Sequence, residues 1–384
     1  MIMDFVWIGI LIVTFAVSAG MLLLLRRTGT GRRTGLVCAV VAFLFTAAFT
    51  LKHIMNAPII LLHYGVYLVG VMCVDGIRSA YEKKHKEQDS EEKKSRRAPV
   101  FVAAAAGCFI YLLIGLFTAN RIKRTEYTLT TEKEIPNGQL CIVQLSDIHL
   151  GTTIDEKDFR KLLKRVSDEK PDVVVITGDF ADVNTKRDLM VRCCEALGEL
   201  KPTYGVFYIG GNHDSEDMKF TPEELHAELR KNGVTVLSDE VFLSATGLCI
   251  IGRKDHSVSR DSIRTLYKRY EEQSREWALV SSSADDSLDC YTVVLDHQPD
   301  DFTAEAEAGV DLVLCGHAHG GFLLPLRWMW KVFPDLVFRV DLCDGMKRIF
   351  GTDFIVSTGA GTCLTDFKTG TVSEYVVIYV KQKR

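Results

Sequence analysis

The sequence has 11 cysteines but no CxxC pair and no regular spacing among them. It therefore gives no support to a framework of disulfides, and an oxidising compartment is neither favoured nor excluded by cysteine usage. Cys193 and Cys194 are neighbours in a helical pattern, a poor geometry for bonding to each other. We expect most of the cysteines to be small buried apolar side chains. A repeat of the solenoid type is also lacking, so an array of stacked repeats is not expected.

Residues 5–25 lack any charged residue and are numerous enough to cross a hydrocarbon core of about 30 Å as a helix. A cleaved signal peptide is not expected, because Asp4 replaces the usual basic residues and no small-residue cleavage site follows. Similar apolar runs occur at 36–51, 54–74 and 98–120. We predict four transmembrane helices from these runs. A re-entrant segment is the alternative for the short second run.

The charge is unevenly distributed along the chain. Residues 1–125 contain 16 Lys+Arg and 7 Asp+Glu, whereas residues 126–384 contain 30 and 43. This division predicts a membrane region, 1–125, followed by a domain of different solvent preference, 126–384. Lys and Arg gather in the first and third predicted loops, which places those loops in the cytoplasm and the 126–384 domain on the extracytoplasmic side of a cell membrane. The residues Arg121, Lys123 and Arg124 oppose this orientation mildly.

After residue 126, apolar strands alternate with amphipathic helices. Strands are expected at 141–145, 173–176, 206–209, 291–295 and 312–314, and helices at 156–167, 186–200 and 221–232. The last helix has Thr221 as its N-cap, Pro222 at the first helical position, Glu224 in a capping box and Gly233 beyond its end. This alternation predicts an α/β layered domain with its polar chemistry at the carboxyl ends of the strands.

Each of these five strands is followed within three residues by Asp, Asn or His, and we call the residues just after each strand its tail. Five of the ten histidines lie in these tails, and the other five, His53, His63, His85, His226 and His256, are assigned no function. His317 and His319 stand two residues apart and would project to the same side of an extended chain. The glycines that follow them let the backbone turn sharply. For this pair taken alone, two loop histidines without a function are the alternative.

The tails combine imidazole, carboxylate and amide donors, which together favour Mn, Fe or Zn. There are enough donors for two ions. Two metals about 3.5–4 Å apart can clamp an in-line displacement at phosphorus, with one bridging carboxylate and a water that becomes the nucleophile. The leaving group also needs an acid, and His213, flanked by Asp214, is suitably placed to donate a proton, so these two are the predicted catalytic residues.

The ordered set of tails resembles the calcineurin-like metallophosphoesterase family. The matching residues are Asp147-x-His149, Gly178-Asp179, Gly211-Asn212-His213-Asp214, His297 and Gly316-His317-x-His319. The resemblance implies a four-layer α/β/β/α sandwich with two divalent metal ions. One ion would be bound by Asp147, His149, Asp179 and His319. The other would be bound by Asp179, Asn212, His297 and His317. Asp179 would then bridge the ions, and His213 would act as an acid rather than a ligand.

Membrane helices followed by a single phosphoesterase domain resemble the bacterial YkuE/YaeI-like branch of that family, which implies phospholipid-like or nucleotide-sugar-lipid substrates. The sequence departs from that branch at Phe322, where Gln is usual, and after residues 357–362, where a Pro-x-Arg element is missing. These departures leave the ligand set intact and bear on the substrate.

The combined expectation is a membrane-tethered, metal-dependent phosphoesterase whose partners are the lipid bilayer and a phosphate ester, possibly lipid-linked. A nuclease would use the same metals, but an acidic domain is poorly suited to a polyanion, so no nucleic acid is expected. A non-catalytic membrane receptor or scaffold is the other alternative. It would not need the complete ligand set together with His213, so the intact set favours the enzyme.

The segment 322–334 follows the last ligand closely and combines two tryptophans and several aliphatic residues with Arg327 and Lys331. Such a mixture is typical of a segment lying in a membrane interface. Pro325 and Pro334 are expected to interrupt regular structure. We expect an apolar rim of the active site that admits the hydrocarbon part of a lipid substrate. A core element is the alternative.

Overall fold

The computed structural model describes residues 107–383, except 216–218, 245, 282–289, 322, 333–339 and 364, together with a few single positions between 60 and 81. Apart from such single positions, the predicted membrane segments 5–25, 36–51 and 54–74 and the first part of 98–120 lie outside these residues. Residues 107–120 form a helix. Among the helices of the described part, none has the length and apolar character needed to span a membrane.

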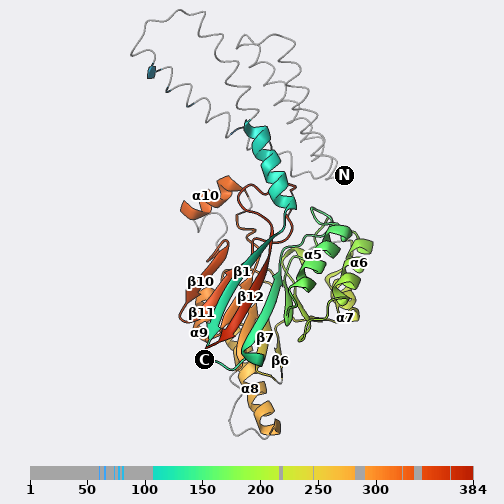
Figure 1. The fold of residues 1–384 in the computed structure, drawn as a ribbon, viewed down its shortest axis with the longest axis vertical. Helices are drawn as coiled ribbons and strands as arrows, with labels where there is room; N and C mark the ends of the chain where they lie inside the picture. Colours follow the sequence, from blue (N-terminus) through green and yellow to red (C-terminus); the bar gives the residue numbers. More distant parts are fainter. Residues whose placement is uncertain are drawn as a thin grey trace, which may run out of the picture. The chain divides into compact units, whose positions relative to one another are not determined.

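The chain divides into two compact units, and the larger one comprises residues 117–363 and 368–384. Its centre is a pair of six-stranded mixed sheets (Figure 1). In spatial order, the first sheet consists of β1 (Lys123–Thr131), β12 (Glu374–Gln382), β2 (Gln139–Leu145), β3 (Val173–Thr177), β4 (Val206–Ile209) and β5 (Val234–Val236). The second consists of β10 (Gly345–Ile349), β11 (Thr352–Val356), β9 (Leu312–Cys315), β8 (Tyr291–Leu295), β7 (Leu248–Gly252) and β6 (Glu240–Leu243).

The central strands, such as β2, β3, β8 and β9, are largely apolar because both of their faces are covered. In β2, Leu140 and Ile142 belong to the core between the two sheets, whereas Cys141 and Val143 belong to the core beneath the helices. The outer face of the first sheet is covered by α5 (Glu156–Asp168), α6 (Arg187–Gly198) and α7 (Pro222–Lys231). The outer face of the second is covered by α8 (Ile263–Ser281) and α9 (Phe302–Ala308). The expected four-layer α/β/β/α sandwich is therefore confirmed.

The structure reproduces the five expected strands within two residues at either end. The capping box of α7 is present, with the Thr221 side chain accepting from Glu224 N and the Glu224 side chain accepting from Thr221 N. The expectation that Pro325 interrupts regular structure is wrong, because α10 (Leu324–Val332) contains it. Proline is tolerated there since it lies in the first turn, where backbone N–H groups have no partner within the helix.

The described cysteines are all free thiols, and all but Cys73 and Cys363 are buried. Cys193 and Cys194 both pack inside the core beneath α6. The expectation that most cysteines serve as small apolar side chains is confirmed for this part of the chain. Cys363 differs, because it is half-buried and lies in the functional site described below.

A buried ion network supports the strand that leads to His297. Arg253, which follows β7, donates to Asp296 Oδ2 at 2.7 Å, to Glu305 Oε1 at 3.0 Å and to Asp301 Oδ2 at 2.8 Å. Burial raises the pKa values of Asp296 and Glu305, and Arg253 opposes that rise. Asp296 immediately precedes His297, so the network holds the end of β8 in place.

We expect Arg253→Ala to lower the free energy of unfolding by about 3–5 kcal/mol, because it leaves the buried Glu305 without its cation and Asp296 with Arg260 alone. Lys164→Ala is the matched control, since Lys164 forms an exposed pair with Asp168 that contributes at most about 1 kcal/mol. Urea unfolding of the full-length protein in detergent measures both. Similar losses for the two variants would contradict this account of the network.

Candidate metal centre

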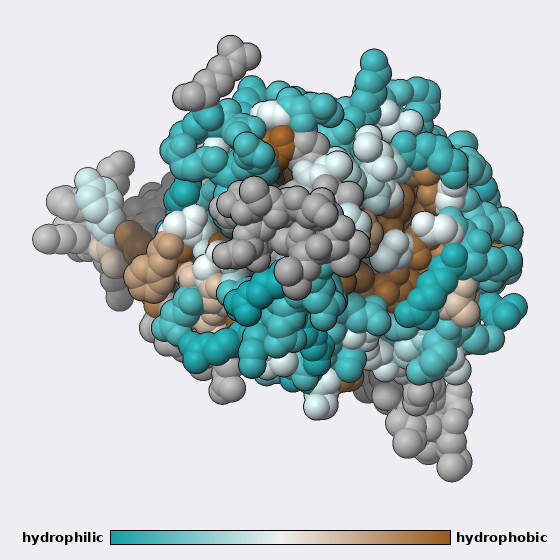
Figure 2. Space-filling model, turned by 90° about the horizontal axis from the view of Figure 1, so that it is seen from below, coloured by the Kyte–Doolittle hydropathy of each residue, from teal (hydrophilic) through white to brown (hydrophobic). Residues whose placement is uncertain are grey.

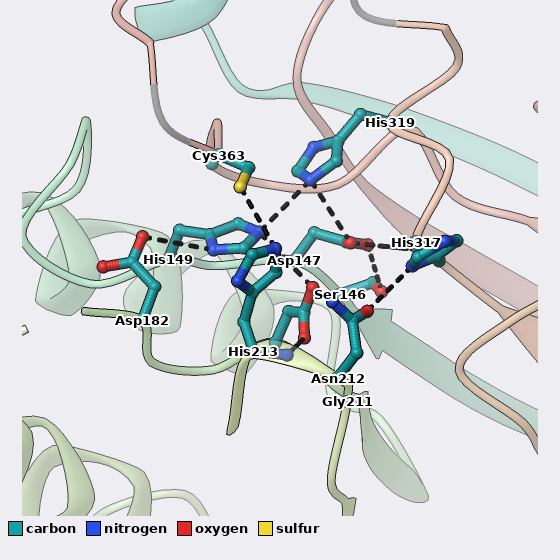
Figure 3. A network of polar contacts seen from close by, with 12 residues as sticks. Ser146, Asp147, His149, Asp182, Gly211, Asn212, His213, His317, His319 and Cys363 are labelled. Carbon is teal, nitrogen blue, oxygen red and sulfur yellow. Dashed lines mark hydrogen bonds and ion pairs between the residues drawn. The ribbon is translucent and has the colours of Figure 1, made fainter. Parts of the chain in front are cut away.

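The strand tails of both sheets meet at one edge of the domain and bring the predicted site residues together (Figure 3). These residues include two groups of three, and within each group the ligand atoms all lie within 4.8 Å of one another. The first group is Asp147, His149 and His319, and the second is Asp179, His297 and His317. The tail of β4 supplies Asn212, whose Oδ1 lies 3.1 Å from His297 Nε2 and 2.9 Å from His317 Nδ1. Asn212 therefore belongs with the second group.

Asp179 links the two groups. Its Oδ2 lies 3.2 Å from His297 Nε2 in its own group and 3.6 Å from His149 Nε2 in the other. Within the first group, His149 Nε2 lies 3.2 Å from His319 Nε2, which in turn lies 3.5 Å from Asp147 Oδ1. One carboxylate oxygen thus lies between imidazoles of both groups, which is the arrangement that a bridging ligand requires.

His317 and His319 fall into different groups, and the expectation that they project to the same side of an extended chain is wrong. Their φ angles are 67° and 47°, so neither residue has the extended backbone that the expectation assumed. The turn continues through Gly320 and Gly321, which also have positive φ angles. The backbone therefore directs the two rings to different groups.

The ligand residues share an unusual backbone conformation. Asp147, His149 and Asp179 have φ angles of 50°, 46° and 51°, so five of the predicted ligands are in the left-handed region. That conformation costs a residue with a side chain on the order of 1 kcal/mol or more, and it persists only where the surroundings impose it. Its concentration in the strand tails marks this edge as a functional site.

Gly316 permits the close approach of the two sheets here. A Cβ atom at this position would lie 1.9 Å from Ser146 Oγ and 2.3 Å from Asp147 Oδ2. Without that atom, His317 N approaches Asp147 Oδ1 to 3.0 Å and donates a hydrogen bond to it. The glycine before His317 is therefore required for Asp147, from the first sheet, to meet the histidine loop of the second.

The outer nitrogen atoms of two histidines are held by the protein. His297 Nδ1 lies 2.8 Å from Thr177 O, and because a carbonyl only accepts, Nδ1 carries a proton and Nε2 is the nitrogen that faces the site. His149 Nδ1 lies 3.3 Å from Asp182 Oδ2, at the long end of the hydrogen-bond range. Thr152 and Asn184 donate to the same buried carboxylate. Both rings thus direct Nε2 inward.

The electrostatics of the site are those of closely packed carboxylates and imidazoles. Burial by itself would raise the pKa of Asp179, but His297 and His149 beside it outweigh burial and keep it ionised. Burial by itself would lower the pKa of His297, and Asp179 reverses this and raises it well above its usual value. Burial and the neighbouring His149 lower the pKa of His319 well below its usual value, so that ring is neutral.

These residues fit a pair of divalent cations. The groups contain inward-facing imidazole nitrogens and ionised carboxylates, the donors that Mn, Zn and Fe accept. The nitrogens His149 Nε2 and His319 Nε2 face each other at 3.2 Å in a buried setting, a separation that suits two nitrogen ligands of one cation.

His213 and Asp214 occupy different environments. The backbone N–H of His213 donates to Asp179 Oδ1 at 2.9 Å, and its ring lies edge-on to that of His149, 5.1 Å between centroids. Asp214 is buried, and it accepts from the backbone N–H groups of Gly211 and Ala181, both at 2.9 Å. Burial and the nearby Asp179 raise the pKa of Asp214 to about 6. These contacts support a positioning role for Asp214, which was predicted to be catalytic.

Three residues that the sequence did not single out also contribute. Asp182 contacts His149, as described above. Cys363 Sγ lies 3.3 Å from His213 Nε2 (Figure 3). Lys368 is buried and donates to the carbonyl oxygens of Thr358 and Gly359. Burial lowers the pKa of Lys368 to about 8.

Lys368 supports the loop that backs Asp147. In that loop, Ala360 N donates to Ser146 O at 2.8 Å and Gly361 N donates to Asp147 O at 2.9 Å. Asp182 was detectable in the sequence as a second acid three residues after Asp179. The contacts of Lys368 and Cys363 have no comparable signal, because they join segments far apart in the chain.

Comparison with known proteins agrees with this geometry. Residues 141–321 match the model of the calcineurin-like phosphoesterase family. An uncharacterized metallophosphoesterase of Aquifex aeolicus is 32% identical over 286 residues, which cover 72% of this chain and 99% of that protein. The uncharacterized metallophosphoesterase YkoQ of Bacillus subtilis is 26% identical over 67% of this chain and 92% of its own. A Danio rerio protein named as a transmembrane protein with a metallophosphoesterase domain is 26% identical over 68% of this chain and 60% of its own.

The chain therefore belongs to the calcineurin-like phosphoesterase family. It is a metal-dependent phosphoesterase, and its substrate is a phosphate ester.

We expect Asp182→Ala to weaken metal binding by about 10–100-fold, because His149 loses the acceptor that orients its Nε2 toward the site. Asp182→Asn keeps a side-chain oxygen and should retain most of the affinity. Calorimetric titration of the metal-stripped, full-length protein with Mn²⁺ measures this. Unchanged affinity in Asp182→Ala would show that His149 is oriented by other contacts.

Proposed function

We propose that this protein is a membrane-tethered phosphoesterase that uses two divalent ions, Mn, Zn or Fe, to hydrolyse a lipid-linked phosphate ester. The observation that carries the proposal is the position of Asp179, whose Oδ2 lies between His297 of one group and His149 of the other. A carboxylate shared in this way suits a pair of ions better than a single one.

In the proposed assignment, the first ion is bound by Asp147, His149, Asp179 and His319, and the second by Asp179, Asn212, His297 and His317. The convergence of these side chains within the two groups supports it. When bound, the ions supply the positive charge that activates a water molecule and stabilises negative charge at phosphorus. The protein holds the ligands rigidly, since the rings are fixed from behind by Thr177 and Asp182.

His213 is proposed to protonate the leaving oxygen of the ester. Its backbone N–H is bound to Asp179, so the ring is held beside the proposed metal pair. Its Nε2 lies 3.3 Å from Cys363 Sγ, at the half-buried margin of the site. That position suits a proton donor at the leaving-group side better than a ligand.

Two substitutions separate these roles. Asp179→Ala should abolish metal binding and hydrolysis together, because the bridging carboxylate serves both ions. His213→Ala should keep both metals and lose about a hundredfold or more in rate on phenyl phosphate, with a smaller loss on p-nitrophenyl phosphate, whose leaving group needs less protonation. Metal analysis and steady-state kinetics measure both effects, and a metal-free His213→Ala protein would reassign His213 as a ligand.

The reaction itself is tested by assaying the purified full-length protein with Mn, Zn, Fe or Mg. Suitable substrates are p-nitrophenyl phosphate, bis-p-nitrophenyl phosphate and a set of phospholipids. The full chain is needed because β1 begins at Lys123 and a cut at residue 126 would remove part of that strand. Asp179→Ala is the control. Turnover of soluble esters alone would leave the phosphoesterase assignment standing and contradict the lipid-linked substrate.

The membrane tether is proposed from the apolar runs of the predicted membrane region, 1–125, which precede the catalytic domain, 126–384. The helix 107–120 exposes a series of apolar side chains at helical spacing, namely Phe109, Ile110, Leu113, Ile114 and Phe117. A stripe of this kind suits lipid better than water. The similarity to a protein named as transmembrane supports the same proposal. Placement in the YkuE/YaeI-like branch remains part of this proposal.

The tether would hold the active site near the lipid. Ser373 N donates to Thr118 O at 3.4 Å, and Ser373 Oγ donates to Ala119 O at 3.0 Å. Two residues earlier, Thr371 Oγ1 donates to the backbone oxygen of His319 at 3.1 Å. The end of the fourth apolar run is thus bonded to the loop that supports a predicted ligand, which favours a substrate presented from a membrane.

From the distribution of Lys and Arg, we expect the catalytic domain on the extracytoplasmic side. Alkaline phosphatase fused after Arg384 should therefore be active, since it matures only outside the cytoplasm, and a fusion after residue 90 should be inactive. The opposite pattern would mean that Arg121, Lys123 and Arg124 outweigh the loop charges or that one apolar run does not span.

A further inference from the structure

The helix α10 presents two different faces. Arg327 and Trp330, three residues apart, point toward the domain. Arg327 donates to Gly320 O at 2.8 Å and to Asp344 Oδ2 at 3.0 Å, and Trp330 packs against Ala318, Val340 and Cys343. The inner face is therefore attached to the loop that carries His319.

The opposite face of α10 is apolar and exposed. Trp328, Met329 and Val332 are 62%, 36% and 47% exposed, and their spacing places them on one side of a helix. Lys331 is also exposed and lies at the margin of this face. A tryptophan more than half exposed in a continuous apolar stripe is costly in water, whereas Trp with a flanking Lys is favoured at a membrane–water interface.

The exposed face lies on the same edge of the domain as the proposed tether. Arg327 binds Gly320 O, while Thr371 binds the oxygen of the preceding residue, His319, and the Thr371–Ser373 segment is bonded to the end of the helix 107–120. The domain is therefore joined to the fourth apolar run close to the loop that α10 binds.

The other end of the domain has a different surface. The helix α8 lies at the end opposite α10 (Figure 1). Figure 2 shows the domain from the α8 end, where the surface is predominantly hydrophilic. The exposed apolar face of α10 therefore distinguishes its end of the domain from the predominantly hydrophilic α8 end.

We propose that Trp328, Met329 and Val332 of α10 insert into the bilayer interface and hold the active-site edge against the lipid surface. The proposal rests on the proposed membrane tether and deepens it by assigning the surface that contacts lipid. Through Arg327 and Gly320, α10 then couples the depth of the lipid contact to the position of the His319 loop.

The test uses the full-length protein in nanodiscs that contain phospholipid brominated on its acyl chains, which quenches tryptophan only on close contact. Trp328→Phe should remove a measurable part of the quenchable fluorescence while preserving an apolar side chain. Trp277→Phe is the matched control, because Trp277 on α8 is also exposed, at 41%, but lies at the hydrophilic end. Its loss should leave the quenched component unchanged.

Trp328→Glu adds a second readout, because a charged side chain in the interface should raise accessibility to iodide about tenfold, the factor that corresponds to about 1.4 kcal/mol of lost lipid contact. An unchanged quenched component in Trp328→Phe would overturn the proposal and leave a protein partner or free exposure as the explanation. Hydrolysis of soluble bis-p-nitrophenyl phosphate by all variants is the independent check. If none of the proteins, including the unsubstituted one, hydrolyses this ester, the result counts against the phosphoesterase function and not against the lipid contact.

Discussion

The arrangement of the site depends on the Asp179 carboxylate. One oxygen accepts the backbone N–H of His213, and the other lies between His297 and His149. These contacts are possible only because the chain turns into the left-handed region as β3 ends, at Gly178 and Asp179. The candidate acid and both ligand groups are therefore positioned by a single side chain at the end of a fully buried strand.

The site also depends on the contact between the two sheets. Gln144 in β2 donates to Thr177 Oγ1 in β3 and to Cys315 O in β9, so it joins the three strands just below the ligands. Above it, Gly316 lets Asp147 and His317 meet. The ligands of each group come from both sheets, and a small change in the spacing of the sheets would separate them. This requirement explains why the sandwich core is apolar and closely packed to its edge.

At the same edge of the domain, the backbone adopts left-handed conformations that are energetically unfavourable for residues with side chains. Five predicted ligands have positive φ angles, and the energy that this requires is offset by buried hydrogen bonds around them. Lys368 donates hydrogen bonds to carbonyl oxygens of the 358–361 loop, and Gly361 N of that loop donates to the backbone oxygen of Asp147. Arg253 donates to the side chain of Asp296 and so supports the end of β8, next to His297. The function of these cations is thus to hold the site rigid.

The sequence alone determined five of the twelve strands in the described part of the chain and, through the family resemblance, the layers and the membership of the site. Runs such as Val206–Ile209 and Leu312–Cys315 are apolar at every position because both faces are buried, and that property can be recognised locally in the sequence. The polar tails that follow them were sufficient to name the candidate ligands. The family resemblance assigned His317 and His319 to different ions, and the tertiary structure decided the positive φ angles by which they separate. It also decided that Asp214 is bound to backbone N–H groups. It also brought Cys363 to His213, 150 residues away in the chain. These features depend on backbone turns and contacts imposed by distant segments, which no local pattern of residues specifies.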